Sequence, residues 1–395
     1  MDKNKRLTVW LPVIIAASIA LGIFIGNHYL SISQGKKRSY SSGNKINAIL
    51  DIIDEQYVDT VSMSKLVEST IPKIFSELDP HSVYIPAEDA SVVNEELEGS
   101  FSGIGVSFNM QTDTILVISV ISGGPAEKAG LLPFDRIISI NDSIFSGKKK
   151  NQGEIMKTLR GAKNSTVKLG VQRGNSPELL YFDVTRGDVP VNSVDVSYEA
   201  AKGIGYIKVS KFARNTYNEF ITAIAKLKQA GCTSFVIDLR GNTGGYMDAA
   251  INMINEFMPE GRLIVYTEGK SFPRSDVYAN GTGTCKDAPI VVLTDEISAS
   301  ASEIFSGAIQ DNDRGTIIGR RTYGKGLVQT QMSLSDGSEM RLTIARYYTP
   351  SGRCIQKKYE MGNTDAYDQD IYNRYMHGEF DSADSIKMDD SLKYQ

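Results

Sequence analysis

The sequence predicts an α/β core with an inserted small β-domain, N-terminal helices and a single transmembrane helix. Three observations lead to this prediction. Near-continuous apolar runs at 234–240 and 289–295 each enter a turn of small residues and then an amphipathic segment, as strands buried on both faces do in α/β proteins. Residues 99–187 instead alternate short strand patterns with glycine-rich turns. Residues 7–26 carry no charge over a length that spans a bilayer as a helix.

Composition narrows the classes of function. The chain has 395 residues, of which 41% are hydrophobic, and this suits two or three domains with well-packed cores. Its 43 Lys and Arg stand against 47 Asp and Glu, and this balance argues against nucleic acid as a partner. The three cysteines lack zinc or disulfide-framework spacing, and no His, Asp and Glu cluster has metal-ligand spacing. We therefore expect no metal and no other cofactor.

The N-terminal segment predicts a membrane anchor. Lys3, Lys5 and Arg6 precede the apolar stretch 7–26, so the positive-inside rule places residues 1–6 in the cytoplasm. A cleavable signal peptide is the competing interpretation, but the stretch is long for such a signal and no clear A-x-A site follows it. We expect an uncleaved, single-pass anchor in the cell inner membrane, with the rest of the chain on the extracytoplasmic (periplasmic) side.

Two segments connect this anchor to the β-domain. Residues 27–44 are polar and rich in serine, which is typical of a flexible linker. Residues 45–92 are predicted as an N-terminal helical region, because apolar residues from Ile46 to Ile74 recur at steps of three and four. The segment 78–86 contains two prolines and breaks that helical pattern.

The segment 93–187 reads as one small β-domain. Its sequences GIGV, GGPAEKAGL and DRIISIND occur in the order found in PDZ domains, which this segment resembles. The resemblance implies that the domain binds a peptide C-terminus by strand addition and holds the terminal carboxylate on backbone N–H groups. The loop that would do so consists of Gly103, Ile104, Gly105 and Val106. The alternative is a β-module that serves only as a packing partner.

The block 188–358 forms the α/β core, and 359–395 follows it as a tail. Two turns of small residues, GNTGG and EISAS, come directly after the two apolar strands, where α/β sheets usually place their sites. Residues 327–348 predict a hairpin about Asp336 and Gly337. After Lys358 the sequence is acidic and aperiodic, which predicts a mobile acidic tail.

These two turns could carry chemistry. The glycines of GNTGG allow backbone N–H groups to approach a ligand closely, which suits an oxyanion hole or a phosphate. The serines of SASASE stand where a helix begins, near its free N–H groups and the positive end of its dipole. Small residues at tight turns more often serve packing, so each turn alone is a weak signal.

A nucleophilic serine needs a partner that takes its proton. The chain has three histidines: His28 borders the apolar stretch and His377 lies in the acidic tail, which leaves His81. No G-x-S-x-G elbow is present. A lysine can act as the base where burial lowers its pKa, and Lys325 lies between two glycines before an apolar run. An ordinary surface lysine in a hairpin is the alternative.

Taken together, the motifs resemble the C-terminal processing (tail-specific) peptidase family, whose members are PDZ-containing serine peptidases with a Ser/Lys dyad. The chain carries LDPHSVYIP, DLRGNTGG, SASASE, GKGLVQ and ARYYTPSGRCIQ in this order between residues 45 and 358. The resemblance implies an α/β peptidase core with a crotonase-like or ClpP-like turn architecture.

The same resemblance assigns the catalytic residues. In the family, the lysine of GKG follows the nucleophilic serine by 25 positions. With Lys325 as that lysine, the resemblance assigns Ser300, rather than Ser298 or Ser302, as the nucleophile. Ser300 would be the nucleophile, Lys325 the general base and acid, and Gln329 the residue that orients the lysine. The Ala301 N–H would form one half of the oxyanion hole.

A glycine N–H from GNTGG would complete the oxyanion hole, and spacing does not choose between Gly244 and Gly245. The implied protein is a membrane-anchored serine endopeptidase that recognises the free C-termini of proteins or peptides and cleaves through an acyl-enzyme. The resemblance is compatible with a homo-oligomer or with a regulatory protein partner and does not choose between them.

One departure from the family pattern favours a second hypothesis. Family members usually continue past the YTPSGR motif into a strand of G-x-GI-x-PD type, and this chain shows no such segment. A truncated or divergent tail with an incomplete core would make the protein a catalytically inert, membrane-tethered PDZ adaptor. A third hypothesis, a crotonase-like acyl-CoA enzyme, would require neither the anchor, nor the PDZ domain, nor the GKG lysine.

Overall fold

The computed structural model describes residues 16–23, 42–111, 114–145 and 152–386. By its internal contacts the chain divides into two units, residues 1–69 and residues 70–395. The helix α2 (Ser42–Gln56) lies in the first unit, and α3 (Met63–Ser76) begins there. Both helices were expected from the three- and four-residue spacing of apolar residues.

The predicted anchor is described only in part. Residues 16–23 of the stretch 7–26 are helical, and the remainder of that stretch lies outside the described residues, as do 1–6 and 27–41. Among the helices that the structure describes, none combines the length and the apolar character that crossing a bilayer requires.

The predicted β-domain is an antiparallel sheet with two short helices, α5 (Pro125–Ala129) and α6 (Gln152–Leu159). The sheet runs in the order β3 (Val106–Gln111), β4 (Thr114–Val120), β5 (Arg136–Ile140), β7 (Thr166–Gln172) and β8 (Leu180–Thr185), with β6 (Ser143–Ile144) beside β5. A two-stranded ribbon of β2 (Ser100–Gly103) and β9 (Gly187–Pro190) begins and ends the domain. Alternate strand residues, among them Val117 and Ile137, are fully buried in the core of this domain.

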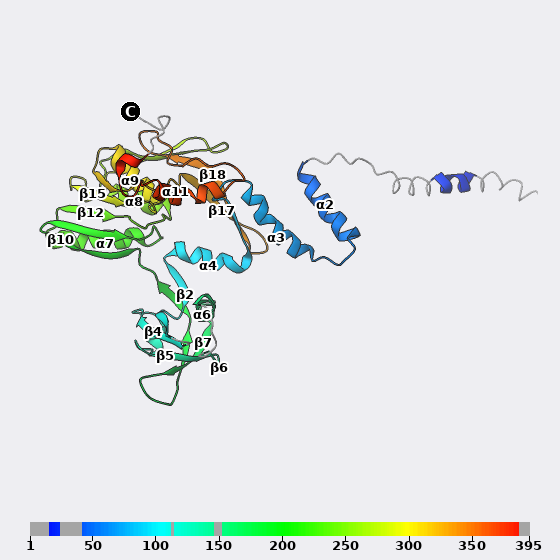
Figure 1. Cartoon of the computed structure of the whole chain (residues 1–395), viewed down its shortest axis with the longest axis horizontal. Coiled ribbons are helices and arrows are strands. Elements are labelled where there is room, and N and C mark those ends of the chain that lie inside the picture. The colour runs from blue at the N-terminus through cyan, green and yellow to red at the C-terminus, as the bar shows by residue number, and fades with distance from the viewer. Residues whose placement is uncertain (1–15, 24–41, 112–113, 146–151, 387–395) are drawn as a thin grey trace, which may run out of the picture. The chain divides into compact units, whose positions relative to one another are not determined.

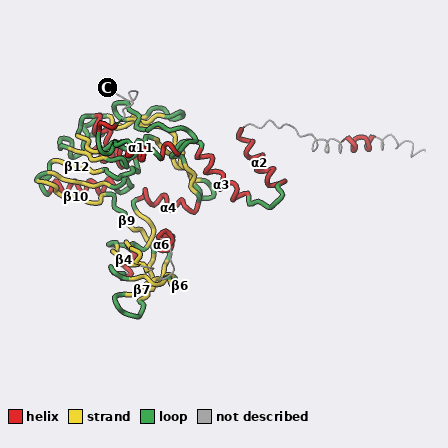
Figure 2. The backbone as a smooth tube through the Cα atoms, viewed as in Figure 1, coloured by secondary structure: helices red, strands yellow, loops and turns green. Residues whose placement is uncertain are grey.

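The peptidase-like core contains a second, mostly parallel sheet. Its order is β10 (Val194–Ala201), β11 (Ile204–Val209), β12 (Ser234–Asp238), β15 (Ile290–Thr294) and β16 (Thr316–Gly319), and only the pair of β10 and β11 is antiparallel. The strands β12 and β15 coincide with the two apolar runs of the sequence. Figure 1 shows β10, β12 and β15 of this sheet with α7 and α8 near them, and β10 and β12 are also labelled in Figure 2.

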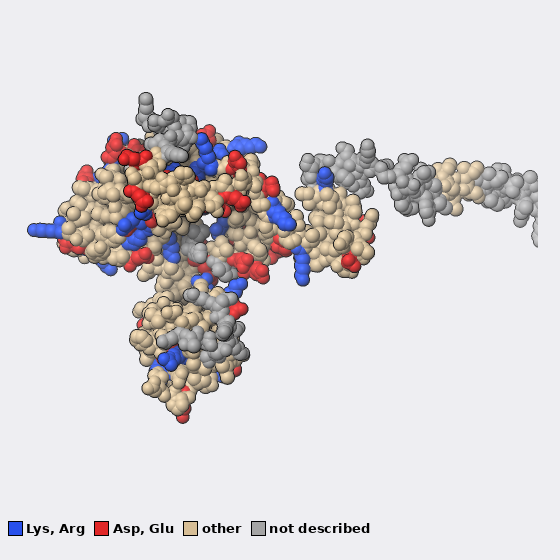
Figure 3. Space-filling view, in the orientation of Figure 1, with Lys and Arg blue, Asp and Glu red and all other residues tan. Residues whose placement is uncertain are grey.

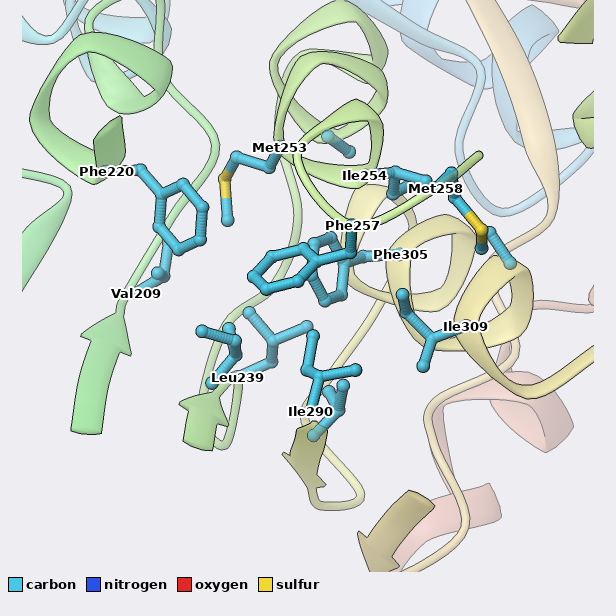
Figure 4. Packing of buried hydrophobic residues seen from close by; sticks show 14 of the residues in the cluster. Val209, Phe220, Leu239, Met253, Ile254, Phe257, Met258, Ile290, Phe305 and Ile309 are labelled. Atoms are coloured by element: carbon cyan, nitrogen blue, oxygen red, sulfur yellow. The ribbon is translucent and has the colours of Figure 1, made fainter. Parts of the chain in front are cut away.

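Three helices pack their apolar faces on this sheet: α7 (Thr216–Gln229), α8 (Met247–Asn255) and α9 (Ala301–Asp311). The Phe257 ring lies edge-on to the rings of Phe220, Phe235 and Phe305. Figure 4 shows Phe257 in the middle of this cluster, with Phe220 and Phe305 near it. All four rings are at most 2% exposed, so the sheet and its helices share one close-packed core. This core fixes the two strand-to-helix turns against each other.

The core also contains a third sheet. It consists of β1 (Val83–Ile85), β18 (Glu339–Tyr348), β13 (Leu263–Glu268) and β14 (Ser275–Tyr278), and β17 (Leu327–Ser333) pairs with β18. The antiparallel pair of β17 and β18 confirms the predicted hairpin, whose turn contains Gly337 at φ +88°. Basic and acidic side chains alternate over the face shown in Figure 3, consistent with the small net charge of the sequence.

Two features of the chain differ from the sequence-based expectation. Helix α4 (Ala87–Glu98) crosses the position where we placed the boundary between the helical region and the β-domain. The prediction of a mobile tail is wrong where α10 (Asp365–Asp368) and α11 (Asp370–Met376) form. The tail folds because its acidic side chains meet basic partners: Asp370 pairs with Lys357, and Glu379 pairs with Arg321. Residues 387–395 lie outside the described part.

Candidate active site

Ser300 occupies the strained turn between β15 and α9. Its backbone has φ +55° and ψ −113°, a conformation that residues other than glycine rarely adopt. The helix begins at the next residue, Ala301, so the first N–H groups of α9 lie around the serine. A sharp strand-to-helix turn of this kind presents a serine hydroxyl to a substrate.

The buried carboxylate of Glu303 links Ser300 to the loop that carries Lys325. Its Oε2 accepts hydrogen bonds from the Ser300 N–H (2.9 Å) and from the Lys325 N–H (2.8 Å). Its Oε1 accepts from the Thr322 hydroxyl and the Gly324 N–H, each at 2.7 Å. Burial raises the pKa of Glu303, and these four donors act in the opposite direction. One side chain therefore holds the main chains of both expected dyad residues.

Lys325 is half-buried in the loop 320–326. Burial lowers the pKa of Lys325 below its ordinary 10.5, the charge of Arg341 lowers it further, and Asp79 and Glu303 act in the opposite direction. No hydrogen bond or ion pair engages the Lys325 Nζ within the described residues. An amine in this environment gives up its proton more readily than a solvated lysine, which is what a general base requires.

The Tyr347 hydroxyl provides a second link between the two residues. It donates to the Lys325 carbonyl oxygen, and the Ser300 side chain lies near enough to lower its pKa. Burial raises the pKa of Tyr347 well above its ordinary value, so the hydroxyl stays neutral. The structure thus brings Ser300 and Lys325 together through Glu303 and Tyr347, while no direct hydrogen bond joins their side chains in the part of the chain described.

The two glycines that spacing could not separate differ in their backbone donors. The Gly244 N–H donates to the Asn242 Oδ1 at 2.8 Å, although a Cβ on Gly244 would stand only 2.7 Å from the Ser300 Cβ. The N–H groups of Gly245 and Ala301 donate to no acceptor among the described residues. Gly245 and Ala301 therefore have the donors that an oxyanion hole needs, and Gly244 supplies the close approach.

Gln329 lies on β17, four residues after the lysine, but its partner is not the lysine. Its amide donates to the His81 carbonyl oxygen, and no hydrogen bond to Lys325 is present within the described residues. The His81 Nε2 lies 2.8 Å from the Tyr367 hydroxyl. Burial and the nearby charge of Lys325 lower the pKa of His81 to about 4, so its ring is neutral at neutral pH. The orienting role of Gln329 stays a prediction.

Asp238 and Arg240 hold the end of β12 in place. Burial opposes ionisation of Asp238, but hydrogen bonds from Arg240 and Tyr206 outweigh it and hold the pKa at about 2. The Arg240 guanidinium binds this carboxylate with two nitrogens, and the Lys208 Nζ lies 3.4 Å from it. These contacts give Asp238 and Arg240 a structural role at the turn that follows β12.

The β-domain contains a groove beside its glycine loop. The groove has a volume of about 210 Å³ and lies between β3 and α6. It is lined by Phe101, Ile104, Gly105, Val106, Ser107, Phe108, Met156, Leu159 and Arg160. Gly105 adopts φ +78°, and the N–H groups of Ile104 and Gly105 donate to no acceptor in the described residues. Three of the four predicted loop residues therefore line the groove; Gly103 precedes it.

Sequence reasoning missed Glu303, Tyr347 and Asp79. A signal for Glu303 was present, because Ser300 and Glu303 have the S-x-x-E spacing of a capping box. Asp79 accepts hydrogen bonds from Ser82 and from the Thr343 hydroxyl. These bonds hold the segment 78–86, which contains two prolines, against β18. The described residues contain no group of three or more His, Cys, Asp or Glu side chains arranged to hold a metal ion.

Comparisons with known proteins give the family. The model of peptidase family S41 matches residues 203–365, and a PDZ-domain model matches residues 102–195. The chain is 35% identical to the carboxy-terminal processing protease CtpB of Bacillus subtilis over 318 residues, 80% of this chain and 66% of that protein. It is 33% identical to a CtpA-like serine protease of Staphylococcus aureus over 365 residues, 90% of this chain and 72% of the relative.

Among solved structures, a photosystem II D1 C-terminal processing protease covers 80% of this chain at 27% identity and a TM-score of 0.45, with 91% of that structure covered. The sequence relatives extend over both the PDZ segment and the core, so the resemblance expected from the motifs is confirmed. The chain belongs to peptidase family S41, the family of these carboxy-terminal processing serine proteases.

Proposed function

We propose that this protein is a membrane-anchored serine endopeptidase that recognises protein C-termini through its PDZ domain and cleaves peptide bonds with Ser300 and Lys325. The observation that carries the proposal is the Glu303 oxygen shared by the Ser300 and Lys325 N–H groups. It fixes a serine at a strained helix start beside a half-buried lysine whose amine has no partner in the described structure. Membership of the family supports the reaction class.

The proposed reaction is acyl transfer. The neutral Lys325 amine takes the Ser300 hydroxyl proton while the Oγ attacks the carbonyl carbon of the scissile bond. The N–H groups of Ala301 and Gly245 hold the resulting oxyanion, and each such donor is typically worth about 3 kcal/mol. The Lys325 ammonium then gives its proton to the leaving amine. The same lysine then takes a proton from water as the water attacks the acyl ester, and it returns this proton to the Ser300 Oγ as the acyl group leaves.

The groove of the PDZ domain supports recognition of a free C-terminus. Among the described residues, β3 lies at the edge of its sheet with β4 as its one neighbour, so a peptide can add beside it. The unengaged N–H groups of Ile104 and Gly105 would bind the terminal carboxylate. Apolar side chains from Leu159 and Met156 would contact the last side chain of the peptide.

The dyad is tested with purified Ser300→Ala and Lys325→Ala variants and an unstructured protein substrate. We expect each substitution to abolish cleavage while the circular dichroism spectrum stays that of the wild type. Ser271→Ala and Lys270→Ala are matched controls because both residues are exposed, and we expect full activity from them. Cleavage by either dyad variant would refute the assignment.

Substrates that differ only in their last three residues test C-terminal recognition in the same assay. We expect the rate of cleavage to change with these residues and to fall when the terminal carboxylate is amidated. Binding of such peptides without any turnover, in a wild-type protein shown to be folded, would instead support the inert PDZ adaptor.

Anchoring through residues 7–26 is a separate part of the proposal and rests on the uncharged stretch of the sequence. We expect the full chain in the membrane fraction and resistant to extraction at high salt and high pH. Removal of residues 1–26 should release it. Added protease should degrade the PDZ domain and core only from the extracytoplasmic side; degradation from the cytoplasmic side would contradict the predicted orientation.

A further inference from the structure

The tail segment that follows the family motifs reaches back to the loop of Lys325. Arg374 on α11 is 5% exposed, and its guanidinium donates to the carbonyl oxygens of Arg321 and of Thr322, the latter at 3.1 Å. Its Nε donates to Glu379 at 2.8 Å. Glu379 in turn accepts two hydrogen bonds from Arg321, at 2.9 and 2.7 Å.

These contacts give hydrogen-bond partners to backbone groups of the loop 320–326, which carries Lys325. Glu303 accepts from the N–H groups of Gly324 and Lys325 on one side of the loop. On the other side, Arg374 donates to the two carbonyl groups that come just before Tyr323. Buried backbone groups need such partners, so the loop conformation depends on both side chains.

Arg374 and Glu379 lie beyond residues 203–365, the part of the chain that matches the family model. The tail is joined to the loop 320–326 by the hydrogen bonds of the buried Arg374 to two loop carbonyl oxygens and by the ion pair of Glu379 with the half-exposed Arg321. Planar guanidinium groups are suited to this task because their donors are fixed in a fork and can bind two acceptors at once.

We propose that Arg374, oriented by Glu379, is a positioning residue that holds the 320–326 loop in the conformation that presents Lys325 to Ser300. This inference rests on the proposed function for its catalytic consequence, but its structural consequence can be measured without any substrate.

Removal of the guanidinium is expected to free the loop without unfolding the protein. In the Arg374→Gln variant, Glu379 keeps its two hydrogen bonds from Arg321, so no buried carboxylate loses all its partners. The loop carbonyls lose their donors, and the loop gains conformations in which the lysine amine is displaced. A displacement of about 1 Å in a catalytic group can cost roughly a hundredfold in rate.

The test combines amide hydrogen exchange with kinetics on the full chain. For Arg374→Gln we expect faster exchange in peptides that cover 319–327, kcat reduced about 10- to 100-fold, and KM within roughly threefold of the wild type. Arg374→Lys keeps the charge but not the fork, and we expect it to restore only part of kcat. Tyr372→Gln is the matched control on the same helix because Tyr372 is 58% exposed.

The pH dependence of kcat/KM separates positioning from a general loss of stability. The charged and titratable groups near the Lys325 amine are Arg341 on β18, Glu303 on α9, and Asp79 and His81 in the segment 78–86. A loosened loop exposes the amine to water, so the ascending limb of the profile should move to higher pH in Arg374→Gln. A loss of stability alone would leave the limb in place.

Unchanged exchange at 319–327 together with unchanged kcat, in a folded Arg374→Gln variant, would overturn the proposal. If Arg374→Gln does not fold, the Glu379→Gln variant tests the proposal instead. This isosteric change keeps the Arg374 guanidinium but removes the carboxylate that orients it. We expect the same faster exchange at 319–327 in this variant. A wild-type protein that cleaves no substrate would refute the proposed function, while the exchange measurement would still decide whether Arg374 holds the loop.

Discussion

Lys325 is the residue whose environment most directly determines the expected chemistry. Burial removes its ammonium from water, and Arg341 adds a like charge nearby, so the neutral amine is favoured in the folded protein. Between the folded pKa and 10.5 the unfolded chain binds more protons at this site than the folded chain does. The contribution of Lys325 to the free energy of unfolding therefore increases as the pH rises through that window and decreases toward lower pH.

Activity should follow the same ionisation. We expect kcat/KM to rise with pH as Lys325 loses its proton, with the midpoint of the ascending limb below 10.5. The measurement is a pH–rate profile on a short peptide substrate without titratable side chains. Lys325→Arg keeps a positive charge that cannot accept a proton at neutral pH, so we expect it to be inactive at every pH. A midpoint at or above 10.5 would contradict a buried base.

The site residues differ in how far the sequence could predict them. Ser300 and Lys325 are predicted from the resemblance to the family, and in the structure the main-chain N–H groups of both donate to Glu303. The preference for Gly245 over Gly244 as the proposed oxyanion donor needed the structure, because it depends on the Asn242 side chain, which accepts from the Gly244 N–H. Gln329 shows the opposite case: its position on β17 follows from the sequence, but its hydrogen-bond partner is His81, 248 positions earlier in the chain.

At the scale of elements, the turn after β12 and the start of α9 are packed backbone against backbone. A Cβ on Gly244 would stand 2.7 Å from the Ser300 Cβ and 2.7 Å from the Ala299 carbonyl oxygen, and Gly244 also has φ +101°. We expect Gly244→Ala to push the helix start away from the turn and to reduce kcat by about 10- to 100-fold, since catalytic geometry tolerates little displacement.

Gly241 provides the matched control for that prediction. It lies in the same turn at φ +72°, but a Cβ there would meet no atom within 4 Å. Gly241→Ala should therefore cost about 1 kcal/mol of stability through backbone strain and leave kcat nearly unchanged. The measurements are kcat and thermal unfolding of both variants. Equal loss of kcat in the two would show that strain alone, and not contact with Ser300, explains the effect.

Strands and helices with a clear period were predicted well, whereas elements that depend on distant partners were not. The strands β12 and β15 could be located from their apolar runs, but the expectation that both faces are buried is wrong. Their burial alternates: Phe235, Ile237 and Val292 are at most 2% exposed, whereas the residues between them on the other face are only partly buried. Helix α11 has only seven residues, DIYNRYM, two of which are tyrosines, and it has no long apolar face. It is held by polar contacts to Arg321 and Thr322, which are some 50 positions away and leave no local pattern.

At the scale of the whole molecule, two separate hydrophobic clusters form cores in the part of the chain that the structure describes. One includes Ile137 and Val117 of the PDZ domain, and the other surrounds Phe257 in the peptidase core. The order of the two modules could be predicted from the sequence because each has its own motifs. The position of α4 could not, because its sequence has only a weak amphipathic pattern and its Glu98 pairs with Arg214, more than 100 positions later.

Two cores that share no residues should respond separately to large-to-small substitutions. We expect Ile137→Ala to destabilise the PDZ domain and Phe257→Ala to destabilise the peptidase core, each by about 2–5 kcal/mol, because both side chains are fully buried. Differential scanning calorimetry of the two variants should show two transitions, of which only one moves in each. The exposed residue Ile144 gives the control, since Ile144→Ala should shift neither transition. If either core substitution moved both transitions equally, the PDZ domain and the peptidase core would unfold as one cooperative unit, and recognition of a C-terminus would be energetically coupled to the stability of the dyad.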